Sequence, residues 1–422
     1  MADSLTSNVA EKLVKKFADR FTSNSVLLKT IDTQEFEGKY TDDTGGTVSI
    51  KRPHQAKVSE TTKGDLTSET ASDIQSGKIT GAIQNRMTVF TDWNSYDEAL
   101  NLNGLDTILD EYAYELAVKF EVKLGAYMLS HGGLAYGTPG TAADAWSDVA
   151  GACGLLKSVG VPSGPINYVV PPMSMLALAD AQNGIDNQGL VKSAWEEAQV
   201  RNFAGTRVMS SDALSTRTCS TATDRAGTLS GAPTVTYVGA KDTMTQVLAV
   251  TGLNGGATFT LKAGEVIEFT GSRYLAHPRN EQTVTDENGD EVQWRCVVTA
   301  DAALTSGAGN VTVTSAGIYE ATGQYNNMSA ALASADAFNV LGTTGAVLKP
   351  NMCYHKKAFS AAFMNIPKLP QSLSAGYVTK EGISIRVSIG GNFTTDTSSI
   401  RFDIHPIFAT MNPLWAMQAY GK

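Results

Sequence analysis

Residues 105–130, LDTILDEYAYELAVKFEVKLGAYMLS, carry the strongest helical pattern of the chain. Apolar and aromatic side chains recur there every three or four residues, the spacing of one helix face: Leu105, Ile108, Leu109, Tyr112, Leu116, Phe120, Leu124 and Tyr127. The other positions are polar: Glu111, Glu115, Lys119, Glu121 and Lys123. His131-Gly132-Gly133 ends the pattern, since glycine favours the backbone conformation that closes a helix. We predict a helix roughly 40 Å long at 1.5 Å per residue, serving either as an ordinary core helix or as the spine of a flat subunit.

A second amphipathic helix is predicted upstream, from Ser7 to Phe21. Asn8 and Glu11 have the spacing of a capping box, which marks a helix start. Four apolar residues recur every fourth position and form one stripe: Val9, Leu13, Phe17 and Phe21. A short terminal helix cannot keep such a stripe in water by itself. We expect it to dock on its own chain or on another one.

The sequence between these helices has little material for a core. From about Glu35 to Trp93 it is rich in Thr, Ser, Gly, Lys and Asp, with strand-like runs only at residues 47–50 and 87–90. Long excursions without a core are usually functional or disordered. We therefore predict an extended hairpin that reaches a neighbouring molecule, with a loose surface loop as the alternative.

The rest of the chain alternates between two kinds of pattern. Residues 137–213 are mixed α/β, with a strand at 166–170, helices at 173–181 and 190–199, and a strand at 208–209. From about 214 to 341 nearly all runs are short, alternating and separated by turn residues, as in a small barrel or sandwich; they include 234–238, 246–250, 258–261, 266–269 and 311–313. Two clean strands follow at 383–387 and 400–404, predicted to pair beside early strands of the main domain. An all-β block between two α/β blocks indicates an inserted domain, which surface loops tolerate.

No catalytic or metal-binding motif stands out. Nucleotide-binding, zinc-protease and serine-hydrolase signatures are absent, and the five histidines are not at metal-ligand spacing to one another. Cys353 and His355 are too few for a zinc site. Four scattered cysteines, Cys153, Cys219, Cys296 and Cys353, indicate reduced buried thiols and not a disulfide framework. We predict no enzyme activity and no cofactor.

Composition points to assembly. Of the 422 residues, 42% are hydrophobic and only 18% charged, so large surfaces can be buried without desolvating many charges. A net charge of −9 argues against sequence-specific nucleic-acid binding but suits a container whose wall repels phosphate. The N-terminus has no signal-peptide pattern and no apolar run is long enough to span a membrane. We expect a protein made and used in the cytosol, or released by lysis.

A family resemblance covers nearly the whole chain. The order of parts is that of an arm helix, a polar excursion, a spine helix, an α/β domain, a β insertion and closing strands. The chain resembles the major capsid (coat) proteins of short-tailed Salmonella- and Shigella-type double-stranded-DNA bacteriophages. The stretches that carry the resemblance are residues 48–55, 76–78, 146–150, 179–182, 194–196, 261–264, 298–302, 349–351 and 381–387.

The resemblance implies an α+β architecture, the Hong Kong ninety-seven-type phage capsid fold with an inserted all-β, barrel-like domain. It implies six parts. They are an N-terminal arm (1–34), an extended loop with flanking strands (35–93), a peripheral domain with the spine helix (94–136), the first part of an axial domain (137–213), the inserted domain (214–345), and the remainder of the axial and peripheral domains (346–422).

The resemblance also implies partners. Copies of the chain are expected to form hexamers and pentamers of an icosahedral procapsid, which matures into the virion shell around double-stranded DNA. The chain begins directly with the arm, so a separate scaffolding protein is implied, with Glu11 and Asp19 as candidate contacts for its basic end. Lys241 and Asp242, in a loop of the inserted domain, are candidates for contacts between capsomers. A portal protein is a further expected partner, and no membrane is involved.

Two other classes stay open from the residues alone. One is a cell-surface adhesion or carbohydrate-binding protein that uses the β domain, which would require secretion. The other is a hydrolase with an accessory β domain, for which the motif search provides no residues.

Overall fold

The computed structural model describes residues 5–33, 49–52, 58, 60–69, 74–94, 105–183, 202–233, 236–279, 282–321, 324–368, 373–378, 382–392 and 394–422. The chain divides into two compact units, each assembled from segments that are distant in sequence. The first comprises Met1–Ser49, Thr80–Gly125 and Phe359–Thr410; the second comprises Ile50–Ile79, Ala126–Ala358 and Met411–Lys422. The helix predicted over residues 190–199 lies outside the described residues.

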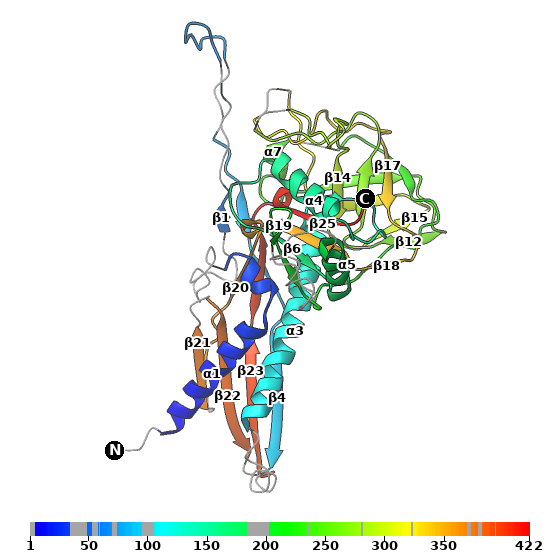
Figure 1. Cartoon of the computed structure of the whole chain (residues 1–422). Coiled ribbons are helices and arrows are strands. Elements are labelled where there is room, and N and C mark those ends of the chain that lie inside the picture. Colours follow the sequence, from blue (N-terminus) through cyan, green and yellow to red (C-terminus); the bar gives the residue numbers. More distant parts are fainter. Residues whose placement is uncertain are drawn as a thin grey trace. The chain divides into compact units, whose positions relative to one another are not determined.

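The first unit contains two antiparallel sheets (Figure 1). A four-stranded sheet has the order β21-β22-β23-β4, and a three-stranded sheet the order β20-β24-β3. Their bounds are β3 Ala82–Ile83, β4 Met87–Asn94, β20 Phe359–Phe363, β21 Leu373–Val378, β22 Ser384–Asn392, β23 Thr397–Ile404 and β24 Pro406–Thr410. β23 pairs with β4 from Thr397↔Asn94 to Ile404↔Met87. This confirms that the closing strands return beside an early strand.

The N-terminal helix α1 (Leu5–Asn24) packs against this sheet, contacting β21 and β22 (Figure 1). Val14, Phe17 and Phe21 are fully buried. The ring of Phe17 stacks on Phe402 of β23 with 4.2 Å between centroids. Phe17 and Phe21 of the predicted stripe therefore dock on their own chain, while Leu13 is only half-buried and the side chain of Val9 lies outside the described part. The predicted cap is wrong, because the helix begins earlier and Asn8 lies inside it; a capping-box spacing is a local signal that additional helical residues upstream override.

The predicted spine helix is confirmed as α3 (Leu105–His131). Leu116, Phe120 and Leu124 are buried as the stripe requires. Glu121, assigned to the polar face, is instead only 3% exposed. Its Oε1 accepts a 2.6 Å hydrogen bond from the backbone N–H of Leu27, in the short 3-10 helix η1 (Leu27–Thr30). A buried carboxylate is tolerated where a donor satisfies it, and periodicity cannot show that a distant backbone group will lie there.

The second unit contains a six-stranded mixed sheet in the order β5-β25-β19-β6-β8-β7. The strands are β5 Leu134–Tyr136, β6 Ile166–Val170, β7 Asn202–Phe203, β8 Thr206–Ser210, β19 Asn351–His355 and β25 Ala416–Ala419. Around them lie α4 (Trp146–Ser158), α5 (Pro172–Asn183) and the 3-10 helices η4 (Lys356–Ala358) and η5 (Pro413–Trp415). All five residues of β6 and of β19 are buried. These two strands therefore lie in the core, as is usual for strands that are covered on both faces.

The inserted block is a closed six-stranded barrel with the order β10-β11-β16-β14-β13-β17. Its strands are β10 Ala226–Leu229, β11 Thr245–Thr251, β13 Val266–Phe269, β14 Arg295–Val298, β16 Gly309–Thr314 and β17 Ala337–Leu341; β12 Thr258–Leu261 and β15 Ala302–Thr305 pair separately. The chain enters and leaves through β9 (Arg217–Thr218) and β18 (Val347–Leu348), which pair antiparallel. The barrel prediction is thus confirmed, and closure removes exposed strand edges.

One predicted strand in this block is wrong. The run at 234–238 was expected to be β, but Tyr237–Ala240 form a short helix, α7, whose first residue follows the cap Thr236. The Thr236 hydroxyl accepts a 3.4 Å hydrogen bond from the N–H of Gly239. Residues 234 and 235 lie outside the described part. Tyr237 is buried against the ring of Tyr325, so tertiary packing overrides the β preference of the run.

Candidate assembly surfaces

The exposed face of α1 holds the two acidic residues predicted to contact a scaffolding protein. Glu11, Lys15 and Asp19 are all exposed and follow one another at four-residue spacing, so they share a ridge of the helix. Lys15 lies between the two acids. On the neighbouring ridge, Arg20 forms an ion pair with Asp110 of α3. The structure therefore places Glu11 and Asp19 where a partner can reach them, but with a lysine between them.

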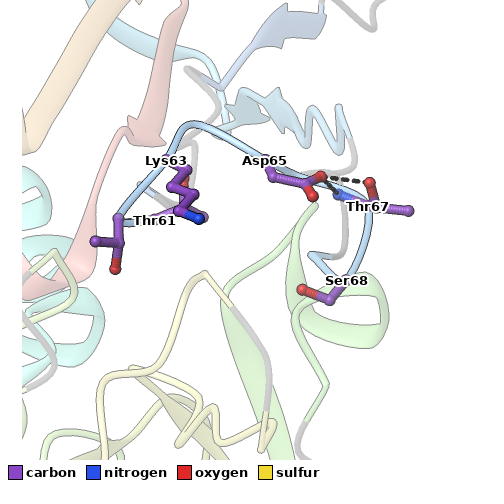
Figure 2. Close-up of a pocket in the computed structure, with 6 residues that line it drawn as sticks. Thr61, Lys63, Asp65, Thr67 and Ser68 are labelled. Carbon is purple, nitrogen blue, oxygen red and sulfur yellow. Dashed lines mark hydrogen bonds between the residues drawn. The ribbon is translucent and has the colours of Figure 1, made fainter.

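The described tip of the extended loop is exposed throughout residues 62–69. Asp65 organises it by accepting hydrogen bonds from the hydroxyl and, at 3.0 Å, the backbone N–H of Thr67 (Figure 2). The hydrogen bond from the Thr67 hydroxyl has the larger effect and the one from the Thr67 N–H the smaller; together they lower the pKa of Asp65 below its usual value. An open hollow at the tip is lined by Thr61, Thr62, Lys63, Asp65, Thr67 and Ser68.

Large apolar side chains also lie exposed along this loop. Val58 is 83% exposed, Leu66 59% and Ile74 81%. A single exposed apolar side chain is ordinary on a soluble protein. Three on one segment that has no core of its own indicate a surface that is covered by something else.

The base of the loop lies against the inserted domain, at the residues predicted to bridge capsomers. β1 (Ser49–Lys51) and β2 (Lys78–Thr80) form a two-stranded sheet. The backbone N–H of Lys78 donates a 2.8 Å hydrogen bond to Oδ1 of Asp242. The Nζ of Lys241 lies 3.3 Å from the same carboxylate. Both predicted residues thus have partners within their own chain.

This contact also affects the Asp242 carboxyl group. The hydrogen bond from the Lys78 backbone, followed by the Lys241 ammonium group, lowers the pKa of Asp242. Its side chain nevertheless remains 53% exposed, and that of Lys241 24% exposed. A second molecule could therefore still reach the Asp242 carboxylate.

Sequence reasoning missed a buried charge cluster at the neck of the inserted domain. Glu265 has no exposed surface. It accepts hydrogen bonds from Arg225 Nη2 at 2.6 Å, from the N–H of Ser220 at 2.9 Å and from the N–H of Lys262 at 2.7 Å. The carboxylate therefore connects the turn at residues 262–265 to the segment at residues 220–225, where the chain enters the barrel. Its sequence neighbours form a turn followed by a strand, a context that gives no sign of a buried ion pair.

Within the described residues, no group of three or more metal-ligating side chains occurs and no helix is long and apolar enough to cross a membrane. The four cysteines are buried and unpaired, as predicted. A second hollow lies between α1 and α3, lined by Arg20, Ser23, Asn24, Asp110, Glu111 and Tyr114. It contains no histidine or cysteine to serve as nucleophile or base.

Comparison with known proteins assigns the chain to a family. The family model described as P22 coat protein, gene protein 5, matches residues 1–421. The major capsid protein of Acyrthosiphon pisum secondary endosymbiont phage 1 is 35% identical over 427 residues, with all of both chains covered.

Two solved structures have a similar arrangement. That of Mycobacterium phage Che8 is 11% identical, with 93% of this chain and 90% of that chain covered and a TM-score of 0.48. The capsid structure of Cyanophage P-SCSP1u is 10% identical, with 94% of this chain and 88% of that chain covered and a TM-score of 0.45. These similarities are low, and the family assignment rests on the sequence matches.

The arm helix, the spine helix, the mixed sheet and the inserted six-stranded barrel constitute the α+β architecture that the sequence predicts. Nearly full-length agreement with the family model and with a curated major capsid protein settles the role as structural and not enzymatic. The chain therefore belongs to the P22 coat protein family and is a major capsid protein that forms the shell of a phage head.

Proposed function

We propose that copies of this chain, in hexamers and pentamers, build a closed precursor shell together with a separate scaffolding protein, and that the shell matures around double-stranded DNA. A portal protein is the other proposed partner. The observation that best supports this proposal is the extended loop, with no core and with Val58, Leu66 and Ile74 exposed. Overlap with a neighbouring subunit would bury these exposed side chains.

Apolar burial would supply most of the association energy. Each square ångström removed from water contributes about 25 cal/mol before the entropic cost of association. Individual contacts can be weak, because each subunit of a shell is held by many neighbours at once. The acidic chain, with a net charge of −9, would enclose DNA without binding a particular sequence.

The assembly proposal is tested by mixing purified chain with purified scaffolding protein. Light scattering should report particles much larger than the subunit, and electron microscopy should show closed shells. Monomers and small oligomers alone, at every ratio of the two proteins, would contradict the proposal.

The scaffold contact is proposed to be electrostatic, with Glu11 and Asp19 facing basic groups of the scaffolding protein. Reversing both charges (Glu11→Lys with Asp19→Lys) should weaken scaffold binding about tenfold at low salt, with less effect at high salt. Lys15 provides a test of sign, because Lys15→Glu should strengthen the same interaction. Asp180→Lys, on the exposed side of α5, is the control and should leave binding unchanged.

Binding is measured by titrating labelled scaffolding protein with each variant at two salt concentrations. If Lys15→Glu weakens binding as much as the double acidic reversal does, the partner is not basic at this place. If Asp180→Lys is equally damaging, the effect reflects overall charge and not this ridge.

Lys241 and Asp242 are proposed to make contacts between capsomers through the exposed part of the Asp242 carboxylate. Asp242→Asn keeps an oxygen acceptor for Lys78 and removes the negative charge. Shells built from this variant should dissociate at lower denaturant concentration than wild-type shells. Equal shell stability of the two would rule out an inter-capsomer ion pair at this residue.

A further inference from the structure

The base of the extended loop is seated on one corner of the inserted domain, and the contact is extensive. Residues 75–78 of the loop lie against residues 237–244, the segment around α7, and against Tyr325. All of these residues belong to the same compact unit. We refer to the corner formed by residues 237–244 and Tyr325 as the loop seat.

Arg52 connects the loop to the seat. It is 8% exposed, and its backbone N–H donates a 2.8 Å hydrogen bond to the carbonyl of Gly77, which joins the two sides of the loop base. Its Nε donates at 3.2 Å to the carbonyl of Lys241, and its Nη1 donates to the carbonyl of Met411. Because a guanidinium presents several donors in a fixed plane, the side chain binds two backbone segments at once, while the backbone of the same residue binds a third.

Close packing supports these polar contacts. Gly77 is buried, and a Cβ atom at this position would collide with the carbonyl oxygen of Lys241. Beside it the rings of Tyr237 and Tyr325 stack, 3.5 Å apart and 4° from parallel. The Tyr325 hydroxyl donates a 3.1 Å hydrogen bond to the carbonyl of Gln75. The loop strand therefore approaches the seat as closely as backbone can, at a position only glycine permits.

We propose that the inserted barrel carries this seat in order to fix the direction in which the extended loop leaves the subunit. The inference rests on the proposed overlap of the loop with a neighbouring subunit. It adds that the inserted barrel influences shell geometry by holding the extended loop of the same chain, in addition to any contact with another capsomer.

The physical reason is pre-organisation. A loop without a core loses conformational entropy when it is ordered on a neighbour, and prior anchoring of its base removes part of that cost. Anchoring also restricts the angles at which neighbouring subunits can be engaged. Because the angle between subunits sets the curvature of a shell, release of the base should broaden the distribution of shell sizes.

Trypsin cleavage of unassembled subunits tests the seat directly. The bond after Lys63, at the exposed tip, serves as an internal reference, and the bond after Lys78 lies in the seat. In the wild-type chain the Lys78 bond should be cut far more slowly than the Lys63 bond. Gly77→Ala should raise the ratio of the two cleavage rates at least about tenfold, and Asp242→Ala about fivefold through loss of one charge-assisted hydrogen bond.

Gly231→Ala is the matched control, since a Cβ atom there would meet nothing within 4 Å. It should leave the ratio unchanged. Thermal unfolding shows whether each variant is folded. If Gly77→Ala fails to fold, Asp242→Ala carries the test, because the half-exposed Asp242 side chain can be removed without disturbing the core.

The same variants are then assembled with scaffolding protein, and shell diameters are measured in electron micrographs. Gly77→Ala and Asp242→Ala should give a broader range of diameters or open forms, and Gly231→Ala uniform shells. An unchanged cleavage ratio in both seat variants overturns the seat. If a seat variant raises the cleavage ratio but still forms shells as uniform in diameter as those of the wild type, the directing role of the seat is overturned. If wild-type chain forms no shells, the proposed function fails along with the directing role, while the cleavage ratio still decides the seat.

Discussion

The inserted barrel and the extended loop are both excursions from the main sheets, yet their physical construction is opposite. Leu248, Phe269 and Val311 in the barrel have no exposed surface. In the loop, every residue from 62 to 69 is exposed. The barrel side chains therefore lie in a core that continues into the mixed sheet of the same subunit, whereas the loop is held at its base by the seat and, in our proposal, is covered by a neighbouring subunit.

This contrast explains why one chain can be a stable subunit and still be built for assembly. Closure pairs all six barrel strands, so the insertion has no long strand edge to offer other chains. The loop instead displays its apolar side chains. Substitutions in the two regions should consequently affect different properties, namely subunit stability for the barrel and shell formation for the loop.

The largest effect is expected at the neck of the barrel. Glu265→Ala leaves the Arg225 guanidinium and two backbone donors without their buried acceptor, and should lower the free energy of unfolding by about 4 kcal/mol. Chemical denaturation of the unassembled subunit measures this loss. A change under about 1 kcal/mol would mean that water replaces the carboxylate and that the neck is not a stabilising element.

Truncation in the barrel core should follow closely. Leu248→Ala removes a fully buried side chain from β11 and should destabilise the subunit by about 3 kcal/mol, because a cavity remains where the methyl groups packed. The barrel should unfold at lower temperature, measured by differential scanning calorimetry. If the variant melted like wild type, burial in the barrel would not be what stabilises the subunit.

In β23, the strand that pairs with β4 where the extended loop ends, the charge of Asp403 should affect subunit stability in a pH-dependent way. Asp403 is fully buried in β23, opposite Arg386 of β22 and Thr88 of β4. Burial by itself would raise the pKa of Asp403, but hydrogen bonds from Thr88, Arg386 and Arg401 outweigh burial and lower it. The ionised carboxylate therefore stabilises the folded chain above the pKa of an unfolded aspartate, near 4, and this contribution is lost as pH falls through the lower folded-state value.

Asp403→Asn should accordingly cost about 2 kcal/mol at pH 7. The difference from wild type should shrink steadily below about pH 4. Denaturant midpoints measured from pH 7 down to pH 2.5 provide the check. A stability difference that is constant over this range would show that hydrogen-bond geometry, and not the charge of Asp403, stabilises β23.

The smallest effect on the subunit is expected at the loop tip. Leu66→Ala makes the same chemical change as Leu248→Ala but at a side chain that is 59% exposed, so subunit stability should change by less than about 0.5 kcal/mol. Shell formation should nevertheless require a higher protein concentration, as measured by light scattering. If Leu66→Ala assembles like wild type, this side chain is not covered by a neighbour.

Much of the fold follows from local pattern. The spine helix and the closing strands were predictable because their apolar residues keep one period over several positions. The strand at 166–170 was predictable from its β-branched and aromatic residues. The errors occur where a distant group decides. Glu121 has the sequence context of a solvated residue but meets the Leu27 backbone, and Tyr237 follows a β-type run but stacks on Tyr325.

The surfaces show the same division. Sequence alone located the coreless loop, the amphipathic arm and the inserted β block, because composition and periodicity are properties of contiguous residues. The family resemblance named Lys241 and Asp242, but not their partners. Arg52 and Gly77 are separated from the Lys241 carbonyl by more than one hundred and fifty positions along the chain. Only the folded chain brings these groups together, since hydrogen bonds and close packing depend on distance in space and leave no regular trace in the order of residues.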